Sequence, residues 1–319
     1  MKNSIFLLWT IFLVGCLEKE ESPKKSFAKT FEEDTKRLIE NLENEKEKPD
    51  ALSQNQVEDK IQNSDDKKFS LTPVADKASE LKESNYIVKS ALNMELIWCP
   101  PGKFIMGPGS AGHAGVSPSF EAVLSHGFYL GKTEVTQKEY EEVMGVNPSS
   151  FKGEGLPVDS VSWYDAVEFC NTLNEIESKP VGWEFSLPTE AQWEYACRAE
   201  TVTLHYWGDK SNPELSNNYS DETVAVGSYR PNPWGFYDME GNVWEWCSDW
   251  FQKYPTGTII DPMGPIRSSN DNLTPEEKGK VVRGGAYDND QLGSTHRTMP
   301  QPTSKKPWIG FRLCLKPVK

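Results

Sequence analysis

The chain has 319 residues, enough for two average domains or for one large domain with an extension. Its 34 Lys and Arg residues are outnumbered by 48 Asp and Glu residues, which gives a formal net charge of −14. Such an acidic surface repels phosphate backbones, so we expect no nucleic-acid partner, whereas a divalent cation or a basic partner suits this charge.

The amino-terminal segment predicts an export signal. The apolar run of residues 5–14 is too short to span a membrane, which takes ~20 apolar residues, but it fits a secretory signal. It ends in Leu13-Val14-Gly15-Cys16, which resembles a bacterial lipobox, where the cysteine thiol receives a diacylglycerol. We therefore expect a lipoprotein signal peptide over residues 1–15 and a lipid anchor on Cys16 that binds the membrane. The alternative is an ordinary signal peptide with an incidental cysteine.

This anchor predicts a place in the cell. Two or more acyl chains hold a protein stably on a bilayer, so we expect a lipid-anchored protein of the cell envelope. Leu17 follows the cysteine where an Asp would retain the protein at the inner membrane. This sorting rule favours the outer membrane.

Residues 16–88 are predicted to be a lipidated, charged tether. Charged runs such as Glu45-Lys46-Glu47-Lys48 dominate residues 17–84, and that segment has no Trp. It cannot bury enough apolar surface to offset the entropy of ordering, so we expect it to be disordered or partly helical. Its expected role is to hold the folded domain away from the bilayer.

Residues 89–319 are predicted to form one globular domain. Short strands are expected over residues 96–98, 104–106 and 128–130, with a turn at 100–103 between the first two. Thr136, Ser162 and Thr189 are expected to begin helices over residues 137–144, 163–174 and 190–198. The later segments are rich in Gly, Pro, Asn and Trp and lack periodicity, which indicates irregular structure held by packing.

Five cysteines follow Cys16, namely Cys99, Cys170, Cys197, Cys247 and Cys314. Because the number is odd, at least one is a free thiol or joins another chain. No pair has CxxC spacing, which excludes a zinc ribbon and a thioredoxin-type site.

Seven phrases occur in order along the domain. They are Pro101-Gly102-Lys103-Phe104-Ile105-Met106-Gly107, Thr133-Glu134-Val135-Thr136, Pro157-Val158-Asp159-Ser160-Val161-Ser162-Trp163, Leu187-Pro188-Thr189-Glu190-Ala191-Gln192-Trp193-Glu194-Tyr195, Gly241-Asn242-Val243-Trp244-Glu245-Trp246, Arg283-Gly284-Gly285 and Gly310-Phe311-Arg312. This succession resembles the sulfatase-modifying factor, or formylglycine-generating enzyme, family over roughly residues 90–317. The resemblance implies an α+β fold, a variant of the C-type lectin-like fold with little regular secondary structure.

The resemblance also implies a chemistry that this sequence does not support. Family members oxidise a sulfatase cysteine with copper held by two cysteines, placed after an Arg-Gly-Gly-Ser-Tyr stretch. Here the two cysteine positions fall on Asn289 and Ser294, and the serine position falls on Ala286. Amide and hydroxyl groups cannot replace the thiolates that Cu(I) prefers, so we expect copper to be absent and no catalytic residue to remain. The run Asp288-Asn289-Asp290 is read as an Asx turn, with a hard-cation site as the alternative.

A calcium site is implied at the Gly-Asn-Val-Trp-Glu phrase. By resemblance, the ligands are the side chains of Asp238 and Glu245 and the carbonyls of Gly241 and Val243. All are oxygens and two are carboxylates, as Ca²⁺ requires, and the ion would be structural. The alternative is that the two carboxylates only brace the loop.

Other residues of the domain have expected structural roles. Members form a disulfide near Cys170 and Cys314, but Cys314 lies one residue beyond the usual place, which would turn it to the other face of its strand. Glu134, Glu190 and Glu194 are expected to be structural carboxylates paired with Arg or backbone amides. Trp163, Trp193, Trp244 and Trp246 are expected in the core, whereas Trp207 and Trp234 are candidates for a ligand cleft.

Three functional hypotheses follow. The first is a binding or scaffold module displayed on the cell envelope, whose partner is an envelope protein, a peptide or a glycan. The second is a formylglycine-generating oxidase acting on sulfatase cysteines. The third is a calcium-dependent glycan-binding module, which needs an exposed ion with open coordination positions.

Overall fold

The computed structural model describes residues 86–88, 93–108, 118–266, 278–288 and 293–318. The predicted signal peptide, Cys16 and almost all of the predicted tether lie outside these residues, as do Asn289 and Asp290. Within the described part, no helix is both long and apolar enough to cross a membrane.

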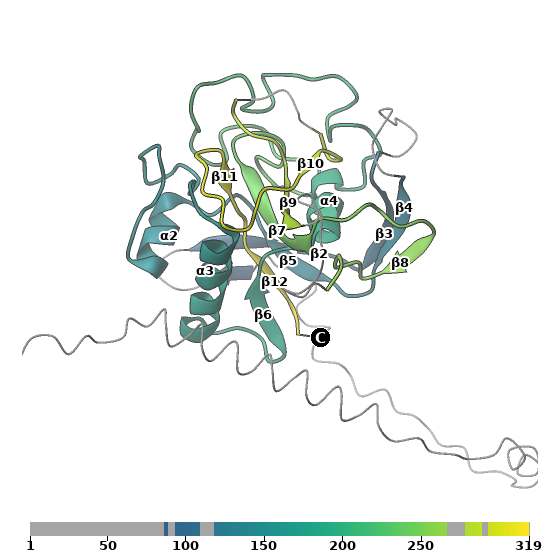
Figure 1. The fold of residues 1–319 in the computed structure, drawn as a ribbon, viewed down its shortest axis with the longest axis horizontal. Helices are drawn as coiled ribbons and strands as arrows, with labels where there is room; N and C mark the ends of the chain where they lie inside the picture. The colour runs from purple at the N-terminus through teal and green to yellow at the C-terminus, as the bar shows by residue number, and fades with distance from the viewer. Residues whose placement is uncertain (1–85, 89–92, 109–117, 267–277, 289–292, 319) are drawn as a thin grey trace, which may run out of the picture. The chain divides into compact units, whose positions relative to one another are not determined.

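A five-stranded antiparallel sheet forms the centre of the domain (Figure 1). Its strands, in spatial order, are β1 (Tyr86–Val88), β2 (Met94–Cys99), β5 (Phe128–Gly131), β12 (Cys314–Pro317) and β6 (Trp183–Ser186). β1 pairs with β2, with Tyr86 opposite Leu96. The folded domain therefore begins inside the range 16–88 that was predicted to be tether, because these residues supply an edge strand.

Two smaller sheets contain both parallel and antiparallel neighbours. One has the order β3 (Gly102–Met106), β4 (Phe120–Leu124), β8 (Thr258–Ile260). The other has the order β10 (Arg297–Thr298), β9 (Lys280–Arg283), β7 (Trp244–Trp250), β11 (Ile309–Gly310). The strands on either side of the 100–103 turn belong to different sheets, since β2 joins the central sheet and β3 a small one.

Each of the three described helices begins with a capping box, in which the cap side chain and the third helical residue bond each other's backbone N–H. The pairs are Thr136 with Glu139 for α2 (Gln137–Met144), Ser162 with Asp165 for α3 (Trp163–Ile176), and Thr189 with Gln192 for α4 (Glu190–Arg198). The predicted helix starts are confirmed. α3 continues two residues beyond the predicted end at 174, until the N–H of Glu177 bonds the carbonyl of Leu173.

The central sheet separates two hydrophobic clusters. The first cluster contains the buried side of α3 together with Leu313 and Leu315, and the second contains the buried side of α4 together with Cys314. Neighbouring residues of β12 therefore face opposite sides, as strand geometry requires. With short strands, three helices and long irregular segments among the described residues, the predicted α+β architecture is confirmed.

The predicted core tryptophans occupy the interior. Trp193 and Trp246 are fully buried and Trp244 nearly so. Trp163 is half-buried, and its indole Nε1 donates to the carbonyl of Cys247 at 2.9 Å. Their large apolar area stabilises segments that have few ladder hydrogen bonds of their own.

Candidate functional site

The segment that would carry copper follows β9 and is folded into the core. Gly284 and Gly285 have φ of 103° and 82°, a region that favours glycine. A Cβ on Gly284 would lie 3.2 Å from the carbonyl oxygen of Met239, which is a tight contact. The close approach of the backbone therefore also favours glycine at this position. After this turn Ala286 is fully buried and belongs to the first cluster. Asn289 lies outside the described residues.

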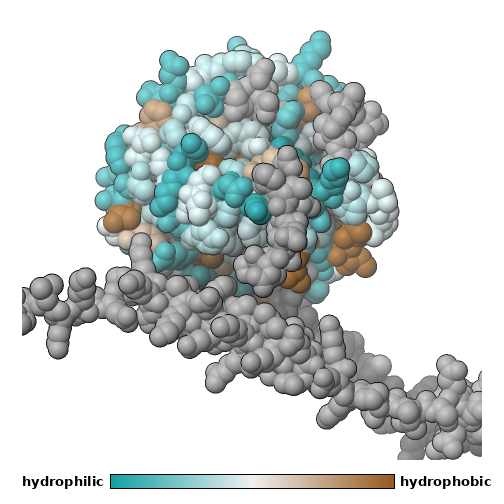
Figure 2. Space-filling model, in the orientation of Figure 1, coloured by the Kyte–Doolittle hydropathy of each residue, from teal (hydrophilic) through white to brown (hydrophobic). Residues whose placement is uncertain are grey.

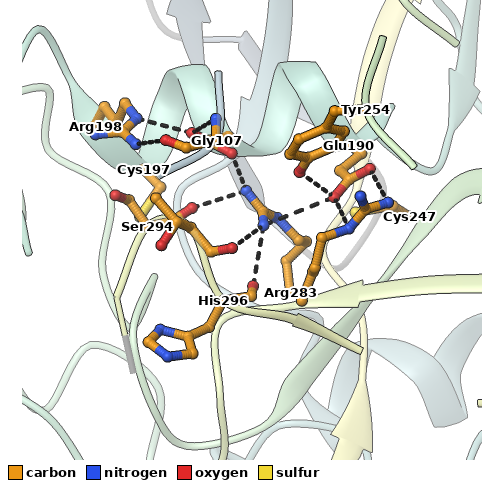
Figure 3. Close-up of polar contacts among 12 residues, drawn as sticks. Gly107, Glu190, Cys197, Arg198, Cys247, Tyr254, Arg283, Ser294 and His296 are labelled. Carbon is orange, nitrogen blue, oxygen red and sulfur yellow. Dashed lines mark hydrogen bonds and ion pairs between the residues drawn. The ribbon is translucent and has the colours of Figure 1, made fainter. Parts of the chain in front are cut away.

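Ser294 is held by a buried arginine rather than presented to a substrate (Figure 3). The guanidinium of Arg283 donates to the carbonyls of Ser294, Thr295 and His296 at 2.7, 3.0 and 3.0 Å. The Ser294 hydroxyl donates to the carbonyl of Leu204 at 3.1 Å, and the residue is 1% exposed. Ser294, at the second of the two positions where family members have a cysteine, therefore has a structural role.

The same arginine pairs with the two glutamates of α4, as Figure 3 shows for Glu190. Arg283 contacts a carboxylate oxygen of Glu194 through Nη2 and lies 3.7 Å from Glu190. Glu194 also accepts from Arg198 and from the N–H of Gly107, both at 2.9 Å.

Glu190 accepts from the Tyr254 hydroxyl and from Arg297, both at 2.8 Å. All four carboxylate oxygens of Glu190 and Glu194 thus have donors. We call this set of Glu190, Glu194, Arg198, Arg283 and Arg297 the arginine network. Both glutamates are structural carboxylates, as predicted from the sequence.

No cysteine among the described residues offers a reactive thiol. Cys99, Cys170, Cys197, Cys247 and Cys314 are all free and buried. Burial raises the pKa of each thiol, to about 12 for Cys314. Because the thiolate is the metal ligand and the nucleophile, these groups are inert in the folded domain.

The disulfide implied between Cys170 and Cys314 is not formed in this structure. Cys170 lies on α3 in the first cluster, whereas Cys314 faces the second cluster on the other side of the central sheet. The one-residue offset of Cys314 from the family's position has this consequence, since adjacent strand residues point to opposite faces.

The predicted calcium ligands lie in a second buried polar cluster. Asp238 has φ of 53° and is 7% exposed, and its Oδ2 accepts from the N–H of Gly227 at 2.6 Å. Its other oxygen, Oδ1, is buried without a hydrogen-bond partner. Burial raises the pKa of Asp238 to about 6.

Glu134 faces Asp238 from the segment before α2. It is 1% exposed, and its Oε1 accepts from Nδ2 of Asn242 at 3.0 Å, while Oε2 is buried without a partner. Burial and the neighbouring Asp238 raise the pKa of Glu134. It is thus a buried carboxylate, as predicted, but it has only an amide donor and no arginine of its own.

Glu245 on β7 is bound on both oxygens by one arginine. Arg312 donates from Nε to Oε2 at 2.6 Å and from Nη2 to Oε1 at 2.7 Å, and Trp193 Nε1 donates to Oε2 at 2.8 Å. Arg312 also donates to the carbonyls of Gly131 and Tyr237. We call Glu134, Asp238, Glu245 and Arg312 the acidic cluster.

The loop that joins Asp238 to β7 is strongly curved. Gly241 and Asn242 have φ of 108° and 64°, and a Cβ on Gly241 would lie 2.5 Å from the carbonyl oxygen of Asn217. The described residues contain no group of three or more His, Cys, Asp or Glu side chains suited to hold a metal. A cation here would need backbone carbonyls or water beside two carboxylates, which Ca²⁺ accepts. The unpartnered oxygens of Glu134 and Asp238 fit such an ion, and those of Glu245 fit it less well because both already accept.

Three further features lie outside these clusters. A cavity of about 380 Å³ is lined by residues 316–318, Thr189 and Gln192 among others, and contains none of the predicted site residues. Trp234 packs against the second cluster, with its ring 5.0 Å from that of Tyr195.

Trp207 stacks on His205 at 4.7 Å, and Nδ1 of this histidine lies 2.5 Å from Oε2 of the buried Glu240. The sequence predicted neither the His205–Glu240 pair nor the role of Arg312. Arg312 ends one of the recognised phrases, but its partner is 67 positions away.

Comparison with known proteins places these features in a family context. Residues 84–317 match the family described as the sulfatase-modifying factor enzyme 1-like domain. Among curated relatives, the chaperone protein LppX of Paenibacillus barcinonensis is 32% identical, with 50% of this chain and 69% of that protein covered. The formylglycine-generating enzyme of Streptomyces coelicolor is 33% identical, with 49% of this chain and 51% of the enzyme covered. The chain therefore spans about half the length of that enzyme.

Solved structures share the fold. Treponema denticola variable protein 1 superposes with a TM-score of 0.62 at 25% identity, covering 73% of this chain and 99% of that protein. PvdO from Pseudomonas aeruginosa superposes with a TM-score of 0.59 at 21% identity, covering 73% of this chain and 98% of that protein. These similarities agree with the fold expected from the sequence.

Proposed function

Because the chain belongs to the family of sulfatase-modifying factor enzyme 1-like domains, we propose that it is a cell-envelope lipoprotein that binds a partner and does not oxidise cysteine. One observation carries the proposal: the sequence has no cysteine between Cys247 and Cys314, and every described thiol is buried. A two-thiolate copper site needs two cysteines that are close together and open to a substrate. A family fold without that site supports binding but not this oxidation.

Copper binding tests the proposal directly. Purified full-length protein is titrated anaerobically with Cu(I) in the presence of a competing chelator, with the Streptomyces coelicolor enzyme as the positive control. We expect no stoichiometric copper uptake by the native protein. Tight uptake of one copper per chain would reject the proposal in favour of the oxidase.

We further propose that the domain holds one structural calcium ion at the acidic cluster. Its carboxylates are at most 7% exposed, which supports an ion that stabilises the fold rather than one that bridges to a sugar. A glycan-binding ion needs open coordination positions at the surface. Glycan-array binding that is abolished by EGTA would therefore favour the lectin-like alternative over a protein or peptide partner.

The lipid anchor is proposed from Cys16 and is tested separately. Metabolic labelling with a palmitate analogue should label the wild-type protein and not Cys16→Ser. Fractionation should place the labelled protein in the outer membrane. A wild-type protein that is released in soluble form without label would reject the anchor, whatever the domain binds.

A second candidate partner is an unfolded polypeptide, favoured by the similarity to a protein named as a chaperone. The face in Figure 2 is largely hydrophilic with separate hydrophobic groups. Exposed apolar side chains include Ile105 on β3 and Ile260 on β8 at 52% and 68%, and Ile266 at 96%. Exposed apolar groups of this kind can hold apolar peptide segments. The measurement is suppression of the aggregation of a thermally unfolded test protein, which Ile105→Ser with Ile260→Ser should weaken.

A further inference from the structure

The cavity of about 380 Å³ beside the central sheet is lined by no residue of the arginine network or of the acidic cluster. The ends of β12 and β6, which run side by side in Figure 1, form one part of its wall, and the first turn of α4 forms another. The turn between β4 and β5 and the segment after β8 complete the wall. Binding sites for small molecules have volumes of ~300–1,000 Å³, so this cavity is large enough for a small ligand.

Three hydrogen-bond donors of the lining have capacity to spare. Gln192 uses its Oε1 to accept from the N–H of Thr189 at 2.9 Å and from the thiol of Cys314 at 3.9 Å, whereas its Nε2 has no partner among the described residues and is not buried. The Thr189 hydroxyl accepts from the N–H of Gln192 at 3.1 Å, which leaves its own proton to donate. Lys316 Nζ lies 3.8 Å from Glu184, too far for a hydrogen bond. An amide, a hydroxyl and an ammonium group can together bind a carboxylate.

The turn before β5 adds an acceptor to the lining. Oδ1 of Asp261 accepts from the N–H of Ser125 at 2.8 Å, and Oδ2 accepts from the Ser125 hydroxyl at 2.6 Å. Because that hydroxyl has only one proton, it must accept from Nδ1 of His126, which lies 2.7 Å away. The proton of a neutral His126 is therefore on Nδ1, and its Nε2 is an acceptor. The hydrogen bonds thus fix an acceptor nitrogen on a residue that lines the cavity.

The charges of the lining favour a ligand that carries a positive group. Glu184 and Asp261 are acidic and Lys316 is basic, so one negative charge remains when His126 is neutral. A simple anion would meet this excess, whereas a ligand with an ammonium group would offset it. The spare donors near Lys316 still need an acceptor, which a carboxylate on the same ligand would supply.

The rest of the lining is mainly apolar. Met263 and Val318 are 49% and 54% exposed. Covering such surface with an apolar group is favourable, because it removes that surface from water. The apolar lining residues are Leu124, Pro262, Met263, Pro317 and Val318.

We propose that this cavity binds a small zwitterion with an apolar body, of the size of a dipeptide. Its carboxylate accepts from Gln192, Thr189 and Lys316. Its ammonium group donates to Nε2 of His126 and lies beside the acidic side chains, and its apolar side chains cover the apolar lining. The inference goes beyond the proposed function, because it involves neither the copper positions nor the acidic cluster.

The test is a ligand-observed NMR titration of the full-length protein with leucyl-leucine. N-acetyl-leucyl-leucine lacks the ammonium group and leucyl-leucinamide lacks the carboxylate. Each should bind at least about tenfold more weakly than leucyl-leucine, because each loses charge-assisted hydrogen bonds. No binding of leucyl-leucine, or equal binding of the three compounds, would overturn the proposal.

Two variants assign the contacts to side chains. Lys316→Met should weaken leucyl-leucine binding about tenfold and change leucyl-leucinamide binding little, since the amide has no charge for Lys316 to contact. His126→Phe should weaken leucyl-leucine binding and leave binding of the N-acetyl compound unchanged. Lys305→Met is the matched control, because Lys305 pairs with Asp165 at 2.7 Å outside the cavity, and it should bind as wild type does.

The melting temperature of each variant shows whether it is folded. If folded Lys316→Met and His126→Phe both bind leucyl-leucine as wild type does, the ligand binds elsewhere and the site proposed here is wrong. Neither outcome bears on copper binding, so this site and the proposed function fail or stand separately.

Discussion

The arginine network and the acidic cluster are both buried and both contain glutamates, yet they differ in how the charge is balanced. In the arginine network, each oxygen of Glu190 and Glu194 accepts from a donor, and three arginines surround the two glutamates. In the acidic cluster, one arginine serves three carboxylates and two oxygens have no donor.

This difference assigns different roles to the two regions. The arginine network is satisfied and serves as structure, because Arg283 binds both the carbonyl of Ser294 and Glu194 on α4. In the acidic cluster two carboxylate oxygens are left without a partner, and it is there that we propose the ion. The predictions below test each side of this contrast.

The largest expected effect comes from opening the arginine network. Arg283→Gln removes one of the two arginines that bind the buried Glu194, together with the donor of three buried carbonyls, and should lower the free energy of unfolding by about 3–5 kcal/mol. Urea denaturation of the variant is the measurement. Lys103→Gln is the control, because Lys103 pairs with Glu121 at the surface and should change stability by less than about 1 kcal/mol. Equal losses in the two variants would contradict the role given to burial.

The second effect adds charge to the acidic cluster. Asn242→Asp replaces the amide that donates to Glu134 by a further carboxylate. In EGTA this should cost about 2–3 kcal/mol, because a buried acceptor loses its donor and gains a like charge. Calcium should recover part of the loss. A variant as stable as wild type in EGTA would show that the cluster is already protonated or solvated.

A smaller effect concerns Asp249, which lies beside the arginine network without a direct cationic partner in it. Burial, followed by the charge of Glu190, raises the pKa of Asp249 to about 7. Its usual value is lower, so between about pH 4 and pH 7 the folded state binds more protons than the unfolded state. This contribution to stability is complete below the unfolded pKa and is lost as the pH rises through about 7.

Asp249→Asn should remove that pH dependence. The oxygen that accepts from the N–H of Glu190 and the hydroxyl of Ser248 can be retained in the amide. We expect the variant to lose a slope worth about 2 kcal/mol between pH 5 and pH 8, as measured by urea denaturation at several pH values. An unchanged slope would mean that Asp249 is ionised throughout this range.

The smallest effect concerns the thiols. Because the five described cysteines are free, a reductant should shift the melting temperature by less than about 1 °C. A thiol reagent should label these cysteines only after denaturation, since each is buried. A large drop on reduction would indicate that a disulfide forms in the native protein.

The sequence predicts some of these features because their causes are local. The capping residues Thr136, Ser162 and Thr189 identify the helix starts, since a cap acts over three or four residues. The offset of Cys314 indicates its strand face, because side chains alternate along a strand. Glu190 and Glu194 lie four positions apart in a predicted helix, so the sequence alone places them on the same side of it.

The acidic cluster could not be predicted in the same way. Glu134, Asp238 and Arg312 lie in three distant segments, and their approach depends on irregular loops that have no periodicity. The resemblance placed Glu245 among the calcium ligands, but it could not show that Arg312 occupies both of its oxygens. The sequence likewise could not show that Trp234, a candidate for a ligand cleft, packs its ring on Tyr195.

The most direct test of the central claim is peptide oxidation. The protein is incubated with Cu(I), oxygen, a reductant and a Cys-x-Pro-x-Arg peptide, and the product is identified by mass spectrometry. The account predicts that the cysteine remains a thiol while the Streptomyces coelicolor enzyme converts it to the aldehyde. Conversion by this protein above the level of free copper would contradict it.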